Sequence, residues 1–413
     1  MTITTITITT KNFWVCAFLA SLVASLFVST ALTNISAALV SIAALVYWFY
    51  YRPWYLLRTP FAFWCMVFLT WIFVRDILAG NSWVAAWGQV SDFRPLIFVI
   101  LWAPLFASLI HRKVAAVMFG ICMAVYCAIV LVATLWTGTP AYTQFYSRAA
   151  DLSGPLLVIA IIVAAELALT LNKQRWLWIA LACLGAIALF AATNRRTGYI
   201  IFVICIMALA LMHSSILKKE KWRSSLFNIT LAAAMSSILL LGSGSAQLGL
   251  EKLKNEINEF SETDLRQQGE INTSTGLRLR FWSVTKELIK DEPWIGTGLS
   301  YFPQKYQQQD LQMGGPGHFV SNPHNEYLYV LAGLGALGLS MYLIIQWQVL
   351  NKVRKFTNQT QRTIINLAML AFMSSIFFNS MIIDMIPGHF YALTILCLGW
   401  YEWSDSAKSE VIP

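Results

Sequence analysis

Residues 114–136, VAAVMFGICMAVYCAIVLVATLW, form an uncharged apolar run that is long enough to cross a lipid bilayer as one helix. Similar runs fill most of the chain on both sides of this one. We expect twelve spans near residues 13–29, 33–50, 60–79, 93–110, 114–136, 152–171, 176–193, 197–213, 226–246, 324–350, 362–383 and 387–403. The sequence therefore predicts an all-α polytopic membrane protein with about 12 transmembrane helices.

The composition agrees with this fold and excludes a soluble enzyme. Of the 413 residues, 58% are hydrophobic and 12% are charged, with a mean hydropathy of +0.61. An ordinary soluble domain carries about 25% charged residues. All seven cysteines lie in apolar runs, and none has a histidine at the spacing of a zinc site. We therefore expect no disulfide, no metal site and no cofactor.

The distribution of basic residues predicts the orientation of the spans. If both termini are cytoplasmic, 16 Lys and Arg residues lie on the cytoplasmic side and 5 lie in short loops on the opposite side. The positive-inside rule favours this arrangement, since it leaves long segments such as 249–323 out of the comparison. The net charge of +9 then reflects topology and contact with membrane lipids, and we expect no nucleic-acid partner.

One long segment has the composition of a soluble protein and carries 10 of the 20 acidic residues. Within it, apolar residues recur at helical spacing in two sets, Leu250, Leu253, Ile257 and Phe260, then Leu277, Phe281, Val284 and Leu288. These sets predict two amphipathic helices that lie against the membrane domain. We divide the chain into spans one to nine (1–248), a periplasmic insert (249–323), and spans ten to twelve with a short cytoplasmic tail (324–413).

The segment Asn322-Pro323-His324-Asn325-Glu326-Tyr327-Leu328 lies where the insert meets the tenth span. Asn322 suits a helix N-cap and Pro323 the first helical position, which predicts that His324 lies in the first turn. A helix N-terminus disfavours imidazolium, so a neutral His324 could accept a proton from a hydroxyl while nearby amides hold a phosphate. Glu326 is two residues away and does not face His324. The alternative is an interfacial histidine that anchors the helix.

The segment Asn194-Arg195-Arg196-Thr197-Gly198 places two arginines on the outer side, against the charge preference of short outer loops. Arginine binds phosphate through a two-pronged fork, which favours a diphosphate partner for Arg195 and Arg196. The alternative is that their side chains extend to lipid headgroups.

A third segment, Gly276-Leu277-Arg278-Leu279-Arg280-Phe281-Trp282, lies on the second amphipathic helix. Arg278 and Trp282 are four residues apart and share a face, while Arg280 points elsewhere. One interpretation is a phosphate-binding arginine beside an aromatic residue that packs on the membrane domain. The other is an ordinary solvated face.

Taken in order, these segments resemble the lipopolysaccharide O-antigen ligases and the related O-antigen polymerases. The resemblance rests on Arg196-Thr197-Gly198, Gly276 to Trp282, Pro293-Trp294-Ile295-Gly296-Thr297-Gly298, Pro323 to Leu328, and Gly333 to Leu339. It covers about residues 190–345. It implies a fold like that of the C-type glycosyltransferases and an enzyme of the bacterial inner membrane that acts at the periplasmic face.

The resemblance also implies the substrates and the roles of the residues. The donor is O-antigen on undecaprenyl diphosphate, and the acceptor is a hydroxyl of the lipid A core oligosaccharide in a ligase or another lipid-linked repeat unit in a polymerase. Such a donor has a good leaving group, so the enzyme mainly needs to stabilise the charge of the departing diphosphate, without a metal. Arg196 and Arg278 would supply this charge, with Arg195 and Arg280 as weaker candidates. His324 would activate or orient the acceptor for an inverting attack, supported by Asn322, Asn325, Glu326, Tyr327 and Trp282.

We favour the ligase because the outer mass forms a single large insert, whereas polymerases often divide it between two loops. The polymerase is the alternative, because it shares these motifs. A transporter or lipid flippase would use broken spans and charges at the membrane midplane. In this sequence the charges cluster at one membrane face.

Overall fold

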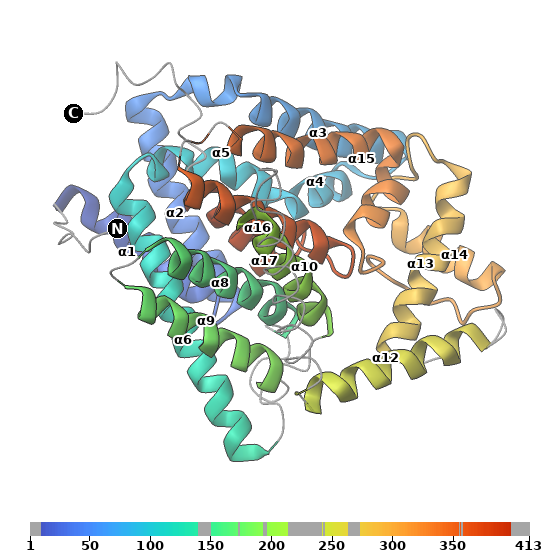
Figure 1. Cartoon of the computed structure of the whole chain (residues 1–413). Helices are drawn as coiled ribbons and strands as arrows, with labels where there is room; N and C mark the ends of the chain where they lie inside the picture. The colour runs from blue at the N-terminus through green and yellow to red at the C-terminus, as the bar shows by residue number, and fades with distance from the viewer. Residues whose placement is uncertain are drawn as a thin grey trace, which may run out of the picture.

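The computed structural model describes residues 10–138, 150–171, 174–192, 196–213, 242, 244–262, 273–354, 356 and 358–397. Over these residues every regular element is a helix, and the all-α prediction is confirmed there (Figure 1). The elements are α1 (Thr10–Ser25), α2 (Thr30–Tyr51), η1 (Trp54–Arg58), α3 (Pro60–Leu78), α4 (Trp83–Asp92), α5 (Arg94–Phe106), α6 (Leu109–Thr137), α8 (Ala150–Thr170), α9 (Arg175–Ile187), η2 (Ala188–Ala192), α10 (Arg196–His213), α12 (Gly244–Glu262), α13 (Ser274–Asp291), α14 (Phe302–Gln312), α15 (Glu326–Val353), α16 (Gln359–Ile376) and α17 (Met385–Cys397).

Several helices have the length and composition of membrane spans. Among the described residues, five are long and apolar enough to cross a membrane, namely α2, α3, α6, α10 and α15. The pair α4 and α5, bent by 60°, makes a sixth if it is one span, and the apolar parts of α1, α8, α9 and α17 are shorter. The expected count of twelve is thus not confirmed. The expected span 226–246 lies almost wholly outside the described residues.

The helix α6 shows how the bundle separates an outer surface from its core. Apolar side chains that are more than half exposed recur every three or four residues along it, at Val117, Ile121, Val125, Ile129 and Val132. An exposed apolar stripe of this length matches a helix face turned towards lipid. The other side of α6 packs against α1.

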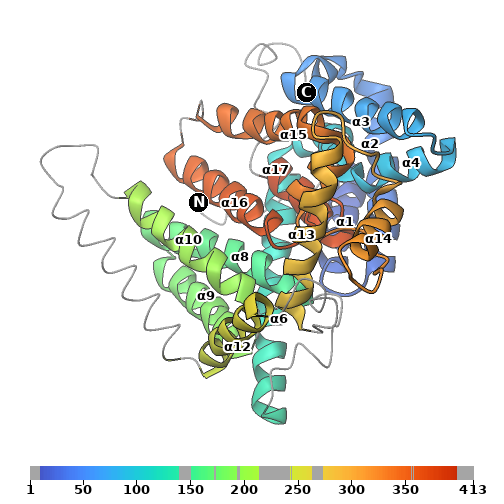
Figure 2. The same cartoon turned by 90° about the vertical axis from the view of Figure 1, so that its right-hand side faces the viewer.

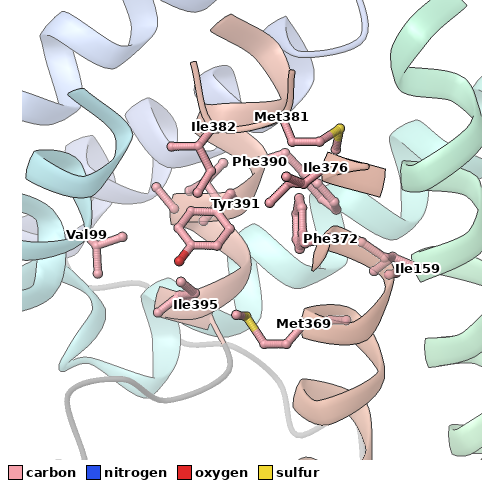
Figure 3. Packing of buried hydrophobic residues seen from close by; sticks show 14 of the residues in the cluster. Val99, Ile159, Met369, Phe372, Ile376, Met381, Ile382, Phe390, Tyr391 and Ile395 are labelled. Carbon is pink, nitrogen blue, oxygen red and sulfur yellow. The ribbon is translucent and has the colours of Figure 1, made fainter. Parts of the chain in front are cut away.

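Side chains from four helices fill the centre of the bundle. Figure 3 shows Phe372 of α16 and Tyr391 of α17 near one another, with Val99 of α5 and Ile159 of α8 on either side. The hydroxyl of Tyr391 donates to Gln346 of α15 over 2.8 Å, so this buried polar group is satisfied. Through this core α16 packs on α8 and α17 packs on α5.

The helix α15 is interrupted at Gly335, where the loop 293–298 docks. Gly335 has φ 69° and ψ −175°, a conformation that essentially only glycine adopts. A side chain there would also meet the carbonyl carbon of Trp294 at 2.2 Å. Backbone hydrogen bonds join the loop to both sides of the break: Thr297 N to Ala332 O (2.9 Å), Gly298 N to Gly333 O (2.8 Å), Ala336 N to Pro293 O (2.8 Å) and Leu337 N to Trp294 O (3.2 Å). The loop thus satisfies backbone groups that the interruption releases.

Arg75 of α3 fastens the same loop from the other side. Its side chain is almost fully buried, and Nε donates to the carbonyl oxygens of Ile295 (3.1 Å) and Gly296 (2.8 Å). Nη2 pairs with the Glu292 carboxylate at 2.6 Å. The segment between the insert helices is therefore attached to both α3 and α15.

The three helices α12, α13 and α14 lie together at the right-hand end of the molecule in Figure 1. In Figure 2, α13 crosses this end, and it packs against α12, α14 and α15. Both amphipathic helices expected from the sequence are present, and α14 is an additional helix that the sequence did not predict. α14 is rich in glutamine, so few apolar residues recur in it at helical spacing. It buries only a few side chains, including Phe302 and Tyr306.

The apolar residues that define these two helices in the sequence are buried to different extents. Val284 and Leu288 of α13 are buried. On α12, however, Leu250 and Ile257 are 42% and 43% exposed, while Glu256 is buried. Glu256 is paired there with Arg196 of α10, so an acid belongs to the inward face of α12.

Candidate active site

Arg196, the first residue of α10, lies in a polar cluster with α12 and α13. Its Nη1 donates to Glu256 Oε2 (2.8 Å) and to Thr275 Oγ1 (3.0 Å), and its Nη2 donates to Glu256 Oε1 (3.1 Å). The Arg196 side chain is 20% exposed and that of Glu256 is 4% exposed. The cluster therefore joins the start of a membrane helix to two helices of the insert.

Glu256 is held as a carboxylate in this cluster. The backbone N–H of Thr275, in the first turn of α13, donates to Glu256 Oε2 over 3.2 Å, where the helix N-terminus favours negative charge. Burial by itself raises the pKa of Glu256, but hydrogen bonds from Arg196 and Thr275 lower it, and the pKa falls below its ordinary value. Glu256 is thus ionised at neutral pH.

Close packing of α10 on α8 accompanies this position of Arg196. Gly198 lies two residues along α10, and a side chain there would meet the Gly154 backbone of α8 at 3.0 Å. The glycine of the Arg196-Thr197-Gly198 segment is therefore explained by the close approach of two helices. Arg195 and Asn194 lie outside the described residues.

The two arginines of α13 are in different surroundings. Arg280 is 1% exposed, and its Nε donates to Asp310 Oδ1 of α14 over 2.8 Å. Asp310 is fully buried and also accepts from the backbone N–H groups of Gly317 and His318, both at 3.0 Å. Arg280 thus fastens α14 and the glycine-rich loop after it to α13, whereas Arg278 is only half-buried.

Arg278 lies on α13 between the Arg196 cluster and His324. Thr275, Arg278 and Trp282 are spaced by three and four residues, so they share one face of the helix. Thr275 bonds to Arg196, and Phe281 stacks on the His324 ring with centroids 6.0 Å apart. A helix rises about 1.5 Å per residue, so Thr275 and Phe281 are about 9 Å apart along its axis.

His324 precedes α15 instead of lying in its first turn, so the predicted helix start is wrong. Asn325 is the N-cap, with Oδ1 accepting from Leu328 N over 3.1 Å, and α15 begins at Glu326. His324 has φ 52°, in the left-handed region that non-glycine residues rarely adopt, which prevents it from joining the helix. The first-turn amides are therefore not those beside His324.

Several hydrogen bonds hold the His324 loop in this conformation. Asn322 Oδ1 accepts from the backbone N of His324 and from Ser380 Oγ, both at 3.0 Å. Trp282 Nε1 donates to the Pro323 carbonyl over 3.0 Å. Strained backbone that its surroundings hold in place is a common feature of functional sites.

A residue between the last two described helices favours one tautomer of His324. His324 Nδ1 lies 3.3 Å from Asn379 Oδ1. Since Oδ1 only accepts, Nδ1 carries the proton and Nε2 carries the lone pair. His324 is then arranged to accept a proton through Nε2.

Glu326 and Tyr327 form hydrogen bonds with elements that surround His324. Glu326 is fully buried and accepts from the Tyr342 hydroxyl (2.7 Å) and from the backbone N–H groups of Met381 (2.6 Å) and Ile382 (2.8 Å). The Tyr327 hydroxyl donates to the Met373 carbonyl of α16 over 3.2 Å. Glu326 thus holds the 379–382 loop, which carries Asn379, against α15.

Three of these residues were not among those selected from the sequence: Glu256, Thr275 and Asn379. Glu256 falls one turn from Leu253 and Phe260, so an acid on that face was the available signal. Thr275 directly precedes the Gly276 segment. Asn379 falls inside the expected span 362–383, where the only available signal was an amide among apolar residues. The described residues contain no group of three or more His, Cys, Asp or Glu side chains arranged to hold a metal ion.

Residues 181–343 match the protein family described as O-antigen ligase. The resemblance found in the sequence is confirmed over this part of the chain, which contains Arg196, Arg278 and His324. No curated protein matches the chain. The matched region runs from α9 to α15 and includes the three insert helices.

Proposed function

We propose that this protein is an O-antigen ligase of the bacterial inner membrane. It transfers O-antigen polysaccharide from undecaprenyl diphosphate to a hydroxyl of the lipid A core oligosaccharide at the periplasmic face, with both termini in the cytoplasm. The observation that carries the proposal is the arrangement along α13. That helix contacts Arg196 through Thr275, carries Arg278 one turn later, and contacts His324 through Phe281.

On the donor side, Arg196 and Arg278 bind the diphosphate and stabilise the charge that develops as it leaves. Guanidinium groups suit this task because they are always charged and because two of their N–H groups can bind two oxygens of one phosphate. Arg195 keeps the supporting role that the sequence gives it. Arg280 is enclosed with Asp310, and we assign to it the positioning of α14 and not contact with the donor.

On the acceptor side, His324 Nε2 accepts the proton of the attacking hydroxyl. The hydroxyl oxygen forms a bond to the anomeric carbon while the bond from that carbon to the diphosphate oxygen breaks. The electron pair leaves with the diphosphate, which stays on its lipid carrier. Attack from the face opposite the diphosphate inverts the anomeric centre, and the fixed arginines supply the charge stabilisation without a metal.

The ligase is favoured over the polymerase by the insert. Its three described helices pack together around α13 and belong to one segment of the chain, between α10 and α15. A single outer mass suits one large acceptor beside one lipid-linked donor. The polymerase is the alternative, and it would transfer the chain to another lipid-linked repeat unit.

The test is the lipopolysaccharide made by cells that lack this gene, carrying either the wild-type gene or His324→Ala. We expect core lipopolysaccharide without O-antigen, and accumulation of long undecaprenyl-linked polymer, unless the wild-type gene is present. Core bearing one repeat unit would instead identify the polymerase. A normal ladder in the deletion strain would refute both.

A further inference from the structure

The hydrogen bonds of Arg196 use one side of its guanidinium. The group has five N–H donors, which form two forks: Nη1 with Nη2 at the end, and Nε with Nη2 along the side. Glu256 occupies the end fork through both carboxylate oxygens, and Thr275 Oγ1 takes the other hydrogen of Nη1. Across the described ranges, Nε and the remaining hydrogen of Nη2 have no hydrogen-bond partner. The side fork, Nε with Nη2, is therefore available to bind a ligand.

Glu256 and Thr275 are themselves anchored, so they can act as a fixed support. Glu256 accepts from the Thr275 backbone N–H and is 4% exposed on its side chain. Thr275 lies in the first turn of α13, next to the cap formed by Thr273 and the Gly276 N–H (3.2 Å). Thr275 therefore belongs to the start of α13, and Glu256 of α12 is hydrogen-bonded to it; α13 is the helix that also contacts His324.

We propose that Glu256 and Thr275 are positioning residues that direct the Nε and Nη2 fork of Arg196 at the donor diphosphate. This inference rests on the proposed function, since it assumes that Arg196 binds the donor. A long arginine side chain loses much conformational freedom when it binds a ligand, and a bidentate carboxylate at its far edge imposes that restriction before the ligand arrives. The carboxylate also balances the charge of Arg196 when no donor is bound.

The side fork presents two parallel N–H groups, the geometry that matches two oxygens of one phosphate. Arg196 still donates both hydrogen bonds when it is paired with Glu256, because guanidinium keeps its protons. Glu256 is therefore compatible with anion binding at Arg196, although it carries the same charge sign as the ligand. It acts through Arg196 and does not contact the donor.

The test measures donor use by the purified full-length protein in lipid nanodiscs. The variants are Glu256→Gln and, as the matched control, Glu251→Gln, which removes the same charge from an exposed position of α12. We expect Glu256→Gln to raise the donor KM about tenfold, because the amide keeps one acceptor oxygen for Arg196 but loses the second and the negative charge. The acceptor KM and the behaviour of Glu251→Gln should stay as in wild type. Affinity for undecaprenyl diphosphate, measured without acceptor, should fall by the same factor.

A second pair of variants covers the case in which Glu256→Gln fails to fold. Thr275→Val removes the hydroxyl that accepts from Nη1, and Thr275→Ser keeps it, so only the first should raise the donor KM. In an Arg196→Ala background, Glu256→Gln should have no further effect on donor KM, because it acts through Arg196. An unchanged or lowered donor KM in folded Glu256→Gln would overturn the inference, and so would equal behaviour of the two Thr275 variants.

The same experiment separates this inference from the proposed function. If Arg196→Ala leaves undecaprenyl diphosphate affinity unchanged, the donor role of Arg196 fails, and the inference fails with it. If Arg196→Ala weakens that affinity but the Glu256 and Thr275 variants do not, the positioning role alone is wrong.

Discussion

Replacing Arg280 by methionine should destabilise the insert rather than weaken donor binding directly. Arg280 and Asp310 are 1% and 0% exposed, and their charged atoms are 2.8 Å apart. Within the part of the chain that the structure describes, Arg280→Met leaves the buried Asp310 carboxylate with the backbone N–H groups of Gly317 and His318 as its donors. Removing one partner of a buried ion pair costs about 3–5 kcal/mol. This is a large part of the roughly 5–15 kcal/mol that stabilises a typical protein.

The assay compares thermal unfolding of the purified full-length protein in detergent with its transfer activity. The control is Arg278→Met, which changes a half-buried arginine two residues away and should raise the donor KM while the melting temperature stays near that of wild type. The double variant Arg280→Met with Asp310→Asn should recover part of the lost stability, because it removes both buried charges while an amide oxygen still accepts from the Gly317 and His318 N–H groups.

One result would refute this reasoning about Arg280. If Arg280→Met melts like wild type but no longer uses the donor, then Arg280 binds the donor and the ion pair with Asp310 contributes little. A double variant no more stable than Arg280→Met alone would also count against the buried pair.

Three further predictions follow from the structure. Gly335→Ala should lower the free energy of unfolding by more than about 3 kcal/mol, because alanine disfavours this backbone conformation and its side chain would clash with Trp294. The amount of folded protein in membranes should fall. Gly120→Ala, which has open space around it, should leave that amount unchanged. Asn379→Ala should lower kcat about tenfold or more with little change in donor KM, because His324 loses the partner that fixes its tautomer; an unchanged kcat would contradict this role. The pKa of Glu256 lies below its ordinary 4.5, so its contribution to stability is present at neutral pH and is lost as pH falls below that value. The melting temperature of wild type should therefore fall more steeply on acidification than that of Glu256→Gln.

Local patterns in the sequence were sufficient for the long apolar helices, but not for α14. Apolar runs predicted α2, α3, α6, α10 and α15, because a helix in lipid must carry apolar residues along its whole length. The start of α15 was misplaced, because Asn322 and Asn325 are both good caps and only tertiary contacts choose between them. Asn322 instead accepts from Ser380 and from His324 N, and this leaves Asn325 to cap the helix.

The sequence by itself determined that the chain is helical and apolar, and which residue types are suited to bind phosphate and accept a proton. Only the tertiary structure decided how those residues are used. Arg278 and Arg280 are two arginines of the same helix. Arg278 is half-buried, whereas Arg280 is buried in an ion pair with Asp310. Arg196 and Glu256 are 60 residues apart, and no local sequence pattern indicates that they pair. The physical reason is that the free energy contributed by a charged group depends on its partners and its burial, and distant segments of the chain supply both.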